Sequence, residues 1–110
     1  MPLSPTNNAI DFSSNNELPL EDIITQMEKE LKMSGENHVF TSEDPSDLIY
    51  ELADFLDGMQ SGSRVSNVLY RIDVNPAKAN PKVPYYLALS ELAWNRVFKK
   101  VWFRKKYKRN

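Results

Sequence analysis

The fold depends most on one stretch near the C-terminus, residues 85–107, which reads YYLALSELAWNRVFKKVWFRKKY. We expect a single helix to begin after Pro84 and to end near Tyr107, about 36 Å later at about 1.5 Å per residue. At about 100° per residue, the apolar side chains of its two halves lie on nearly opposite sides, so the apolar stripe changes sides near Ala93. The early set is Tyr85, Ala88, Leu89 and Leu92, and the late set is Trp94, Val97, Phe98, Val101 and Trp102.

This reversal raises the question of what covers the late aromatic residues. If the first half of the helix packs into the core, Trp94, Phe98 and Trp102 should point away from it. Burial of each such side chain is worth about 2 to 3 kcal/mol, so we expect all three to be covered. The cover is either this chain itself, through a bend or burial on several sides, or a second copy, another protein or a membrane surface. The candidate interface consists of Leu92, Trp94, Phe98, Val101 and Trp102.

Cations are concentrated in the same helix and in the residues after it. A basic helix that carries Trp and Phe can lie in the interface of a bilayer and be attracted by anionic lipid. The same cations could contact the phosphates of nucleic acid, although no recognised nucleic-acid motif accompanies them. The candidate anion-binding residues are Arg96, Lys99, Lys100, Arg104, Lys105, Lys106, Lys108 and Arg109.

The charge of the whole chain is strongly asymmetric although its net charge is only −1. Residues 1–57 hold 13 acidic residues and two lysines, whereas residues 58–110 hold 12 basic residues and two acidic ones. The two halves therefore attract each other. This polarity can steer a partner, or it can be satisfied within the fold or between copies of the protein.

Two segments upstream carry clear helix signals. Apolar residues recur at helical spacing from Leu20 to Leu31, with Pro19 suited to the first turn and Gly35 suited to the stop. A second helix is predicted after Asp44, which can cap free amides ahead of a proline in the first turn. Glycine and serine residues between 58 and 63 should end this second helix.

Residues 65–74 are ambiguous, because their apolar residues fit both a helix and an alternating strand. We favour a helix capped by Ser63, since the neighbouring segments are helical and a lone strand would lack an obvious partner. The alternative is a short hairpin formed by residues 66–74 and 82–88. Residues 75–84 contain three prolines and should form a connector before the last helix.

These segments predict an all-α protein, a small bundle of about four helices, with α+β as the alternative fold. Residues 1–16 are rich in Ser, Asn and Pro and should be a flexible leader. Residues 17–110 should form a single helical domain, because 110 residues of which 41% are hydrophobic suffice for one modest core.

Residue types that carry chemistry are scarce. Cysteine is absent and His38 is the only histidine, which excludes thiolate chemistry and a two-histidine metal site within one chain. The glycines match no phosphate-binding motif. Asp47, Glu51 and Asp54 share one helix face, but acidic residues opposite an apolar stripe are usual for a helix exposed to water. An enzyme would need a pocket that unites these carboxylates with Asp73 or His38.

The expected function is therefore that of a non-enzymatic protein that binds itself or another protein through its last helix, without a cofactor, metal or small-molecule substrate. The alternative is a peripheral protein that binds an anionic membrane surface or nucleic acid through the basic residues of that helix. A cytoplasmic location is expected, because no segment resembles a secretory signal and no apolar run approaches the roughly 20 residues of a membrane span.

Overall fold

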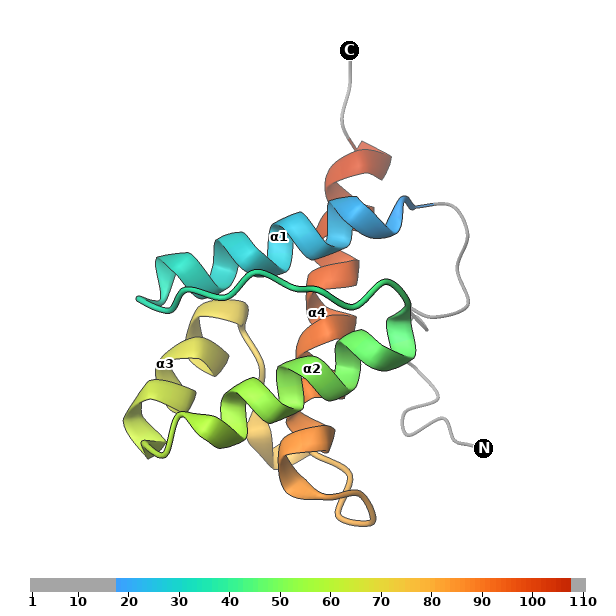
Figure 1. Ribbon diagram of the computed structural model, residues 1–110. Helices are drawn as coiled ribbons and strands as arrows, with labels where there is room; N and C mark the ends of the chain where they lie inside the picture. The colour runs from blue at the N-terminus through green and yellow to red at the C-terminus, as the bar shows by residue number, and fades with distance from the viewer. Residues whose placement is uncertain (1–17, 108–110) are drawn as a thin grey trace.

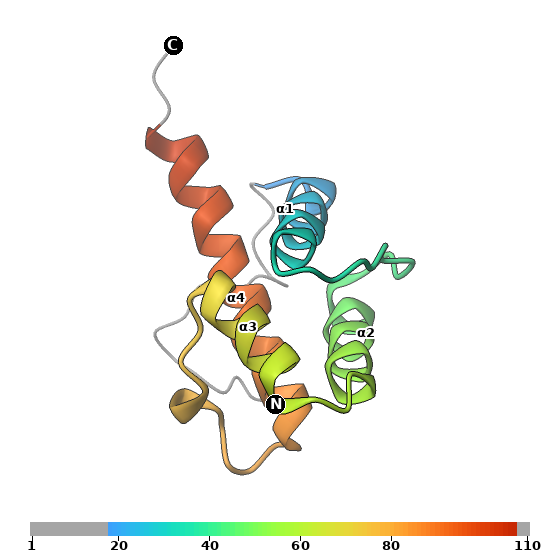
Figure 2. The same cartoon turned by 90° about the vertical axis from the view of Figure 1, so that its left-hand side faces the viewer.

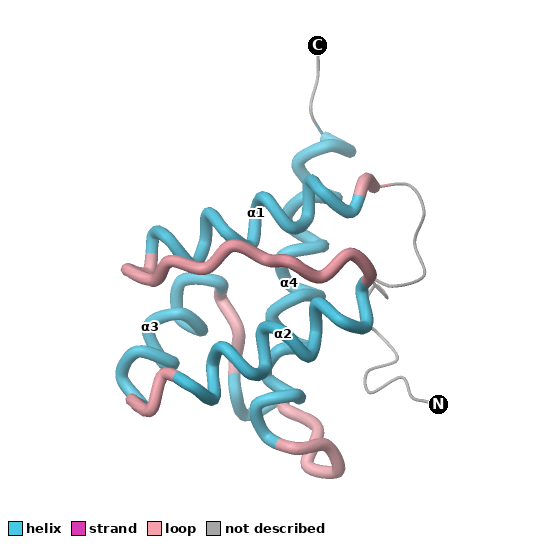
Figure 3. Tube along the Cα trace, in the orientation of Figure 1, coloured by secondary structure: helices cyan, strands magenta, loops and turns pink. Residues whose placement is uncertain are grey.

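The computed structural model describes residues 18–107 and is entirely α-helical apart from turns and connections (Figure 1, Figure 3). The predicted bundle of four helices is confirmed. No strand occurs between residues 18 and 107, so the alternative hairpin of residues 66–74 and 82–88 is wrong. The leader, residues 1–16, lies outside the described residues. The helices are α1 (Leu20–Met33), α2 (Pro45–Gly58), α3 (Gly62–Ile72) and α4 (Tyr85–Tyr107), with a 3-10 turn η1 (Pro76–Lys78) between α3 and α4.

Local signals place the ends of the helices. The side chain of Asp44 accepts a hydrogen bond of 3.0 Å from the backbone amide of Asp47, and Pro45 occupies the first turn of α2 as predicted. Helix α1 stops where Gly35 adopts φ +90, a conformation that favours glycine. Helix α3 is capped by Ser61 rather than by the predicted Ser63, because the helix already begins at Gly62.

Helix α4 is the centre of the fold. Helices α1, α2 and α3 each pack against it, and α1 also packs against α3. Figures 1 and 2 show α2 and α1 crossing α4 at different heights, with the segment 34–44 running between them. The last turns of α4 extend beyond α1 in both views. One helix is thus surrounded along most of its length, and its C-terminal end projects beyond α1.

The core is a single cluster to which all four helices contribute. Trp94 and Phe98 of α4 are its largest fully buried side chains. The ring of Phe40, from the segment between α1 and α2, meets the Trp94 ring edge-on at 5.1 Å between centroids. The Nε1–H group of Trp94 donates a hydrogen bond of 3.1 Å to the backbone carbonyl of Leu48. Trp94 therefore joins α2, α4 and the segment between α1 and α2.

Candidate functional site

The structure places most of the candidate interface in the core of the same chain. Trp94, Phe98 and Val101 have no exposed surface, and Leu92 and Trp102 are partly buried. The expectation that these aromatic residues point away from their own body is wrong, because α4 is covered on several sides by α1, α2 and α3. The apolar stripe changes sides because different helices cover α4 along its length.

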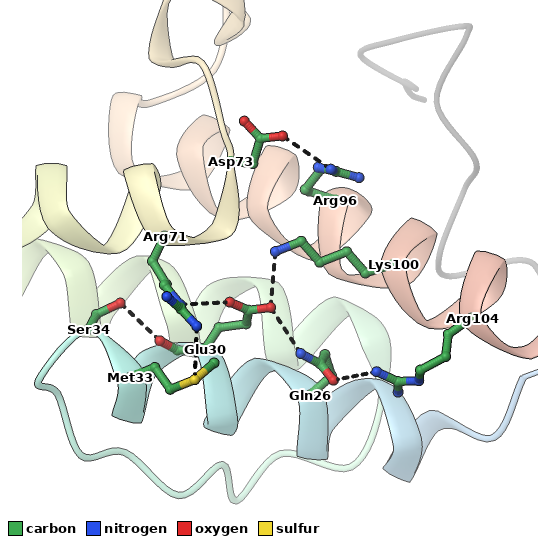
Figure 4. A network of polar contacts seen from close by, with 9 residues as sticks. All are labelled: Gln26, Glu30, Met33, Ser34, Arg71, Asp73, Arg96, Lys100 and Arg104. Carbon is green, nitrogen blue, oxygen red and sulfur yellow. Dashed lines mark hydrogen bonds and ion pairs between the residues drawn. The ribbon is translucent and has the colours of Figure 1, made fainter.

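Four of the six described candidate anion-binding residues are engaged by the chain itself, and Figure 4 shows three of them, Arg96, Lys100 and Arg104. The closest contacts are 3.0 Å between Lys100 Nζ and Glu30 Oε2, and 2.7 Å between Lys105 Nζ and Asp22 Oδ2. Arg96 pairs with Asp73 at 3.1 Å, and Arg104 donates to the amide oxygen of Gln26 at 2.9 Å. Lys108 and Arg109 lie outside the described residues. The basic side of α4 is thus largely directed at α1 and at the end of α3.

Glu30 is the centre of this polar network, and sequence reasoning missed it. Its side chain is only 5% exposed, yet it receives hydrogen bonds from Lys100 and, at 2.9 Å, from Gln26. Arg71 of α3 lies 3.8 Å away, so one carboxylate connects α1, α3 and α4 (Figure 4). A signal was present, because Glu30 follows Met27 by three residues and therefore lies on the apolar face of its helix.

The exposed side of the projecting end of α4 carries two aromatic rings. Phe103 is 45% exposed and Tyr107 is 64% exposed. Their rings stack, with an interplanar angle of 7° and 5.8 Å between centroids. Neither residue belonged to the candidate interface, because the late apolar set drew attention to the opposite side of the helix. Their four-residue spacing was the available signal.

Three cations border this aromatic pair. Lys99 and Lys106 form no ion pair with any residue between 18 and 107, and Arg104 contacts only the neutral amide of Gln26. The ammonium group of Lys106 lies 5.2 Å from the centroid of the Trp102 ring, and the Lys106 side chain is exposed to solvent. At about 100° per residue, Arg104 lies on one side of the pair and Lys106 on the other. The outer face of α4 is defined here as Lys99, Phe103, Arg104, Lys106 and Tyr107.

The carboxylates of α2 divide into one that is engaged and two that are exposed. Glu51 accepts hydrogen bonds of 2.6 Å from the Ser42 hydroxyl and 2.9 Å from the Ser42 amide. Its other oxygen lies 2.7 Å from His38 Nε2, and the Thr41 amide donates to both oxygens. Asp47 and Asp54 remain exposed on the solvent side. Glu51 therefore attaches the segment 38–42 to α2.

The grouping of Ser42, Glu51 and His38 does not have the geometry of a catalytic triad. A nucleophilic serine needs its hydroxyl on the imidazole that will accept the proton, whereas Ser42 donates directly to the carboxylate. The His38 ring is also held between Phe40 and Phe55, each at 4.6 Å between centroids. Within residues 18–107, no group of three or more acidic or histidine side chains could hold a metal ion. These residues serve to anchor a loop.

Acid should loosen this anchor. Burial alone would raise the pKa of Glu51, but hydrogen bonds from Ser42, His38 and Thr41 outweigh it and hold the pKa below its ordinary value of 4.5. Glu36 also has a lowered pKa, because Arg64 donates to its carboxylate. A carboxyl whose pKa is lowered by folding stabilises the protein above its unfolded pKa and loses this contribution as the pH falls through the folded value. We therefore expect Glu51 and Glu36 to contribute their full stabilisation above about pH 5 and to lose it progressively as the pH falls further.

The variant Glu51→Gln tests this assignment. It should lower the free energy of unfolding by about 2 kcal/mol at pH 7, because a hydrogen-bonded charge is lost from a largely buried position. Its stability should also depend less on acid than that of the wild type, in urea titrations between about pH 7 and about pH 3. An unchanged acid dependence would show that Glu51 contributes nothing to the pH response.

Three open depressions lie on the surface formed by residues 18–107. One of about 380 Å³ is lined by Tyr70, Arg71, Asp73 and Val74. Two others lie at the end of α4, with volumes of about 260 Å³ beside Trp102 and about 930 Å³ beside Tyr107. None of these three brings the carboxylates of α2 together with Asp73 or His38.

The helices of residues 18–107 include none whose length and apolar character would allow it to cross a bilayer. Comparisons of the chain with models of known families, with curated proteins and with solved structures give no significant match.

Proposed function

We propose that this chain is a non-enzymatic interaction protein that binds an acidic protein surface through the outer face of α4. The observation that carries the proposal is the exposed, stacked pair of Phe103 and Tyr107, bordered by cations without acidic partners among the described residues. The pair stands on the last turns of α4, which extend beyond α1 (Figure 2).

The chemistry of this face suits a protein partner. Aromatic side chains supply large contact areas at small entropic cost and often dominate the energetics of interfaces. Lysine and arginine around them accelerate the encounter with an acidic surface and fix its orientation. The other exposed cations of α4 already have partners within the chain, so the outer face of α4 is where a further acidic group gains most.

The non-enzymatic character is part of the proposal. It is supported by the use of Glu51, Ser42 and His38 as a loop anchor and by the internal pairing of Glu30. We also propose a cytoplasmic location, since a chain without cysteine has no need of an oxidising compartment.

Site-specific photo-crosslinking in the cells that produce the protein tests this function. Phe103 is replaced by benzoylphenylalanine, a photoreactive analogue, and the same group at Asn67, exposed on α3, serves as the matched control. We expect a crosslink from position 103 that maps to an acidic segment of a protein and is absent from position 67. The double variant Lys99→Gln with Lys106→Gln should lower the yield of this crosslink at least fivefold, because the substitutions remove two positive charges and leave the aromatic rings in place.

Other results would contradict the proposal. Crosslinks from position 103 to lipid or nucleic acid would indicate a peripheral binder of anionic surfaces instead. Equal labelling from positions 67 and 103 would indicate that the outer face of α4 has no specific partner.

A further inference from the structure

We infer that the acidic surface bound by the outer face of α4 is the exposed side of α2 in a second copy of the same chain, so that copies associate head to tail. This inference rests on the proposed function and names its partner. Self-association is favoured because the molecule itself carries a surface whose charge is complementary to the outer face of α4.

The exposed side of α2 has the charge and the aromatic character that the outer face of α4 requires. Tyr50 is 58% exposed, and Asp47, Asp54 and Asp57 around it are exposed without an ion pair among the described residues. At about 100° per residue these four side chains fall within about 80° of the helix surface. The acidic face of α2 is defined here as Asp47, Tyr50, Asp54 and Asp57.

The electrostatic potential at this face is negative. Asp47 is hydrogen-bonded to the neighbouring Asp44 and repelled by its charge, and its pKa is raised as a result. A cation from outside would relieve this repulsion. Each face thus holds an aromatic group and three unneutralised charges, of opposite sign on the two faces.

The two faces cannot meet within one molecule. In Figures 1 and 2 the last turns of α4 and helix α2 lie on opposite sides of α1. The molecule measures 43 Å along its longest axis, and α2 packs against the first half of α4, where Ser90 and Trp94 donate to carbonyls of α2. The attraction between them can only be satisfied between molecules.

Net charge favours this partner over a membrane or a nucleic acid. At a net charge of −1 two copies repel each other little, and association is easiest near neutrality. A phosphate-rich surface would attract the end of α4 but would repel the acidic face of α2. In a head-to-tail pair the acidic face of one copy meets the basic face of the other. Such contacts use two different surfaces, so they close into a ring or continue as a chain.

Sedimentation velocity of the purified full chain tests the inference. At about 0.02 M salt the sedimentation coefficient should rise with protein concentration, and at about 0.5 M salt it should return to the monomer value. Two variants reverse the charge of one face each: Lys99→Glu with Lys106→Glu, and Asp54→Lys with Asp57→Lys. Each alone should be a monomer. The matched control is Lys78→Glu with Lys82→Glu, two exposed lysines of the connector, which should associate like the wild type.

Mixing separates head-to-tail contact from other modes of association. An equal mixture of the two charge-reversed variants restores two complementary contacts, one between the intact faces and one between the reversed faces, so it should associate although each variant alone is a monomer. A chain that carries all four substitutions should associate again, because its charges are exchanged rather than lost. Association of the mixture and of this chain also demonstrates that the variants are folded.

Three results would overturn the inference. The first is that the wild type stays monomeric at low salt. The second is that the charge-reversed variants associate like the wild type. The third is that an equal mixture of the two charge-reversed variants does not associate. A monomeric wild type combined with a crosslink from position 103 to another acidic protein would reject self-association alone. Absence of both would reject the proposed function as well.

Discussion

Replacing Trp94 by alanine should lower the free energy of unfolding by about 4 kcal/mol, a large part of the stability of a domain of this size. The side chain has no exposed surface and contacts the ring of Phe40. Its removal leaves a large cavity and also leaves the carbonyl of Leu48 without its 3.1 Å hydrogen bond from the indole. Urea denaturation followed by circular dichroism measures the change.

Trp102 provides the matched control on the same helix. It is partly buried and packs at the edge of the core, so Trp102→Ala should cost about 1 kcal/mol. Trp94→Phe separates the hydrogen bond from the packing and should cost roughly half as much as Trp94→Ala. A folded Trp94→Ala variant that loses less than about 1 kcal/mol would place this residue at an interface rather than in the core.

The helices could be predicted from the sequence because their signals are local. The adjacent residues Asp44 and Pro45 begin α2, and Gly35 ends α1 through its own backbone conformation. Whether residues 62–72 form a helix or a strand was harder, since their apolar residues fit both periods. The adjacent Ser61 cap and the left-handed Asp73 at the end resolve it in favour of a helix.

The surroundings of α4 could not be predicted in the same way. An apolar stripe tells which side of a helix is covered but not by what, and α4 has a different neighbour for each part of its length. Phe98 is enclosed by its own chain, whereas Phe103, five residues later, is 45% exposed. This difference depends on where α1 crosses α4, which no local pattern encodes.

The same limit applies to the charges. Lys100 and Glu30 are separated by 70 residues along the chain, yet they form a 3.0 Å contact. A count of charges in the two halves predicts their attraction but not the pairs that form. The count therefore overstated the number of cations available to an external anion. It also could not separate Lys99, Arg104 and Lys106, which have no acidic partner among the described residues, from the cations that form ion pairs.

The pair of Glu30 and Lys100 should show the second large effect, and the two single variants should differ in size. Lys100→Met leaves a carboxylate that is only 5% exposed, with Arg71 at 3.8 Å as its remaining cation. Glu30→Leu leaves Lys100, which is 24% exposed and can extend its ammonium group into water. Because an uncompensated charge costs more the deeper it is buried, we expect a loss of about 4 kcal/mol for Lys100→Met and about 2 kcal/mol for Glu30→Leu.

Combining the two substitutions should recover most of the loss, since apolar groups of similar size often replace a buried ion pair without cost. Glu30→Leu with Lys100→Met should therefore lie within about 1.5 kcal/mol of the wild type, which corresponds to a coupling of several kcal/mol in a double-mutant cycle. The Arg96→Met variant is a control, because its partner Asp73 is 78% exposed and needs no compensation. If the effects of the two substitutions at positions 30 and 100 simply add, the carboxylate of Glu30 is stabilised by Gln26 and Arg71 and not by the lysine.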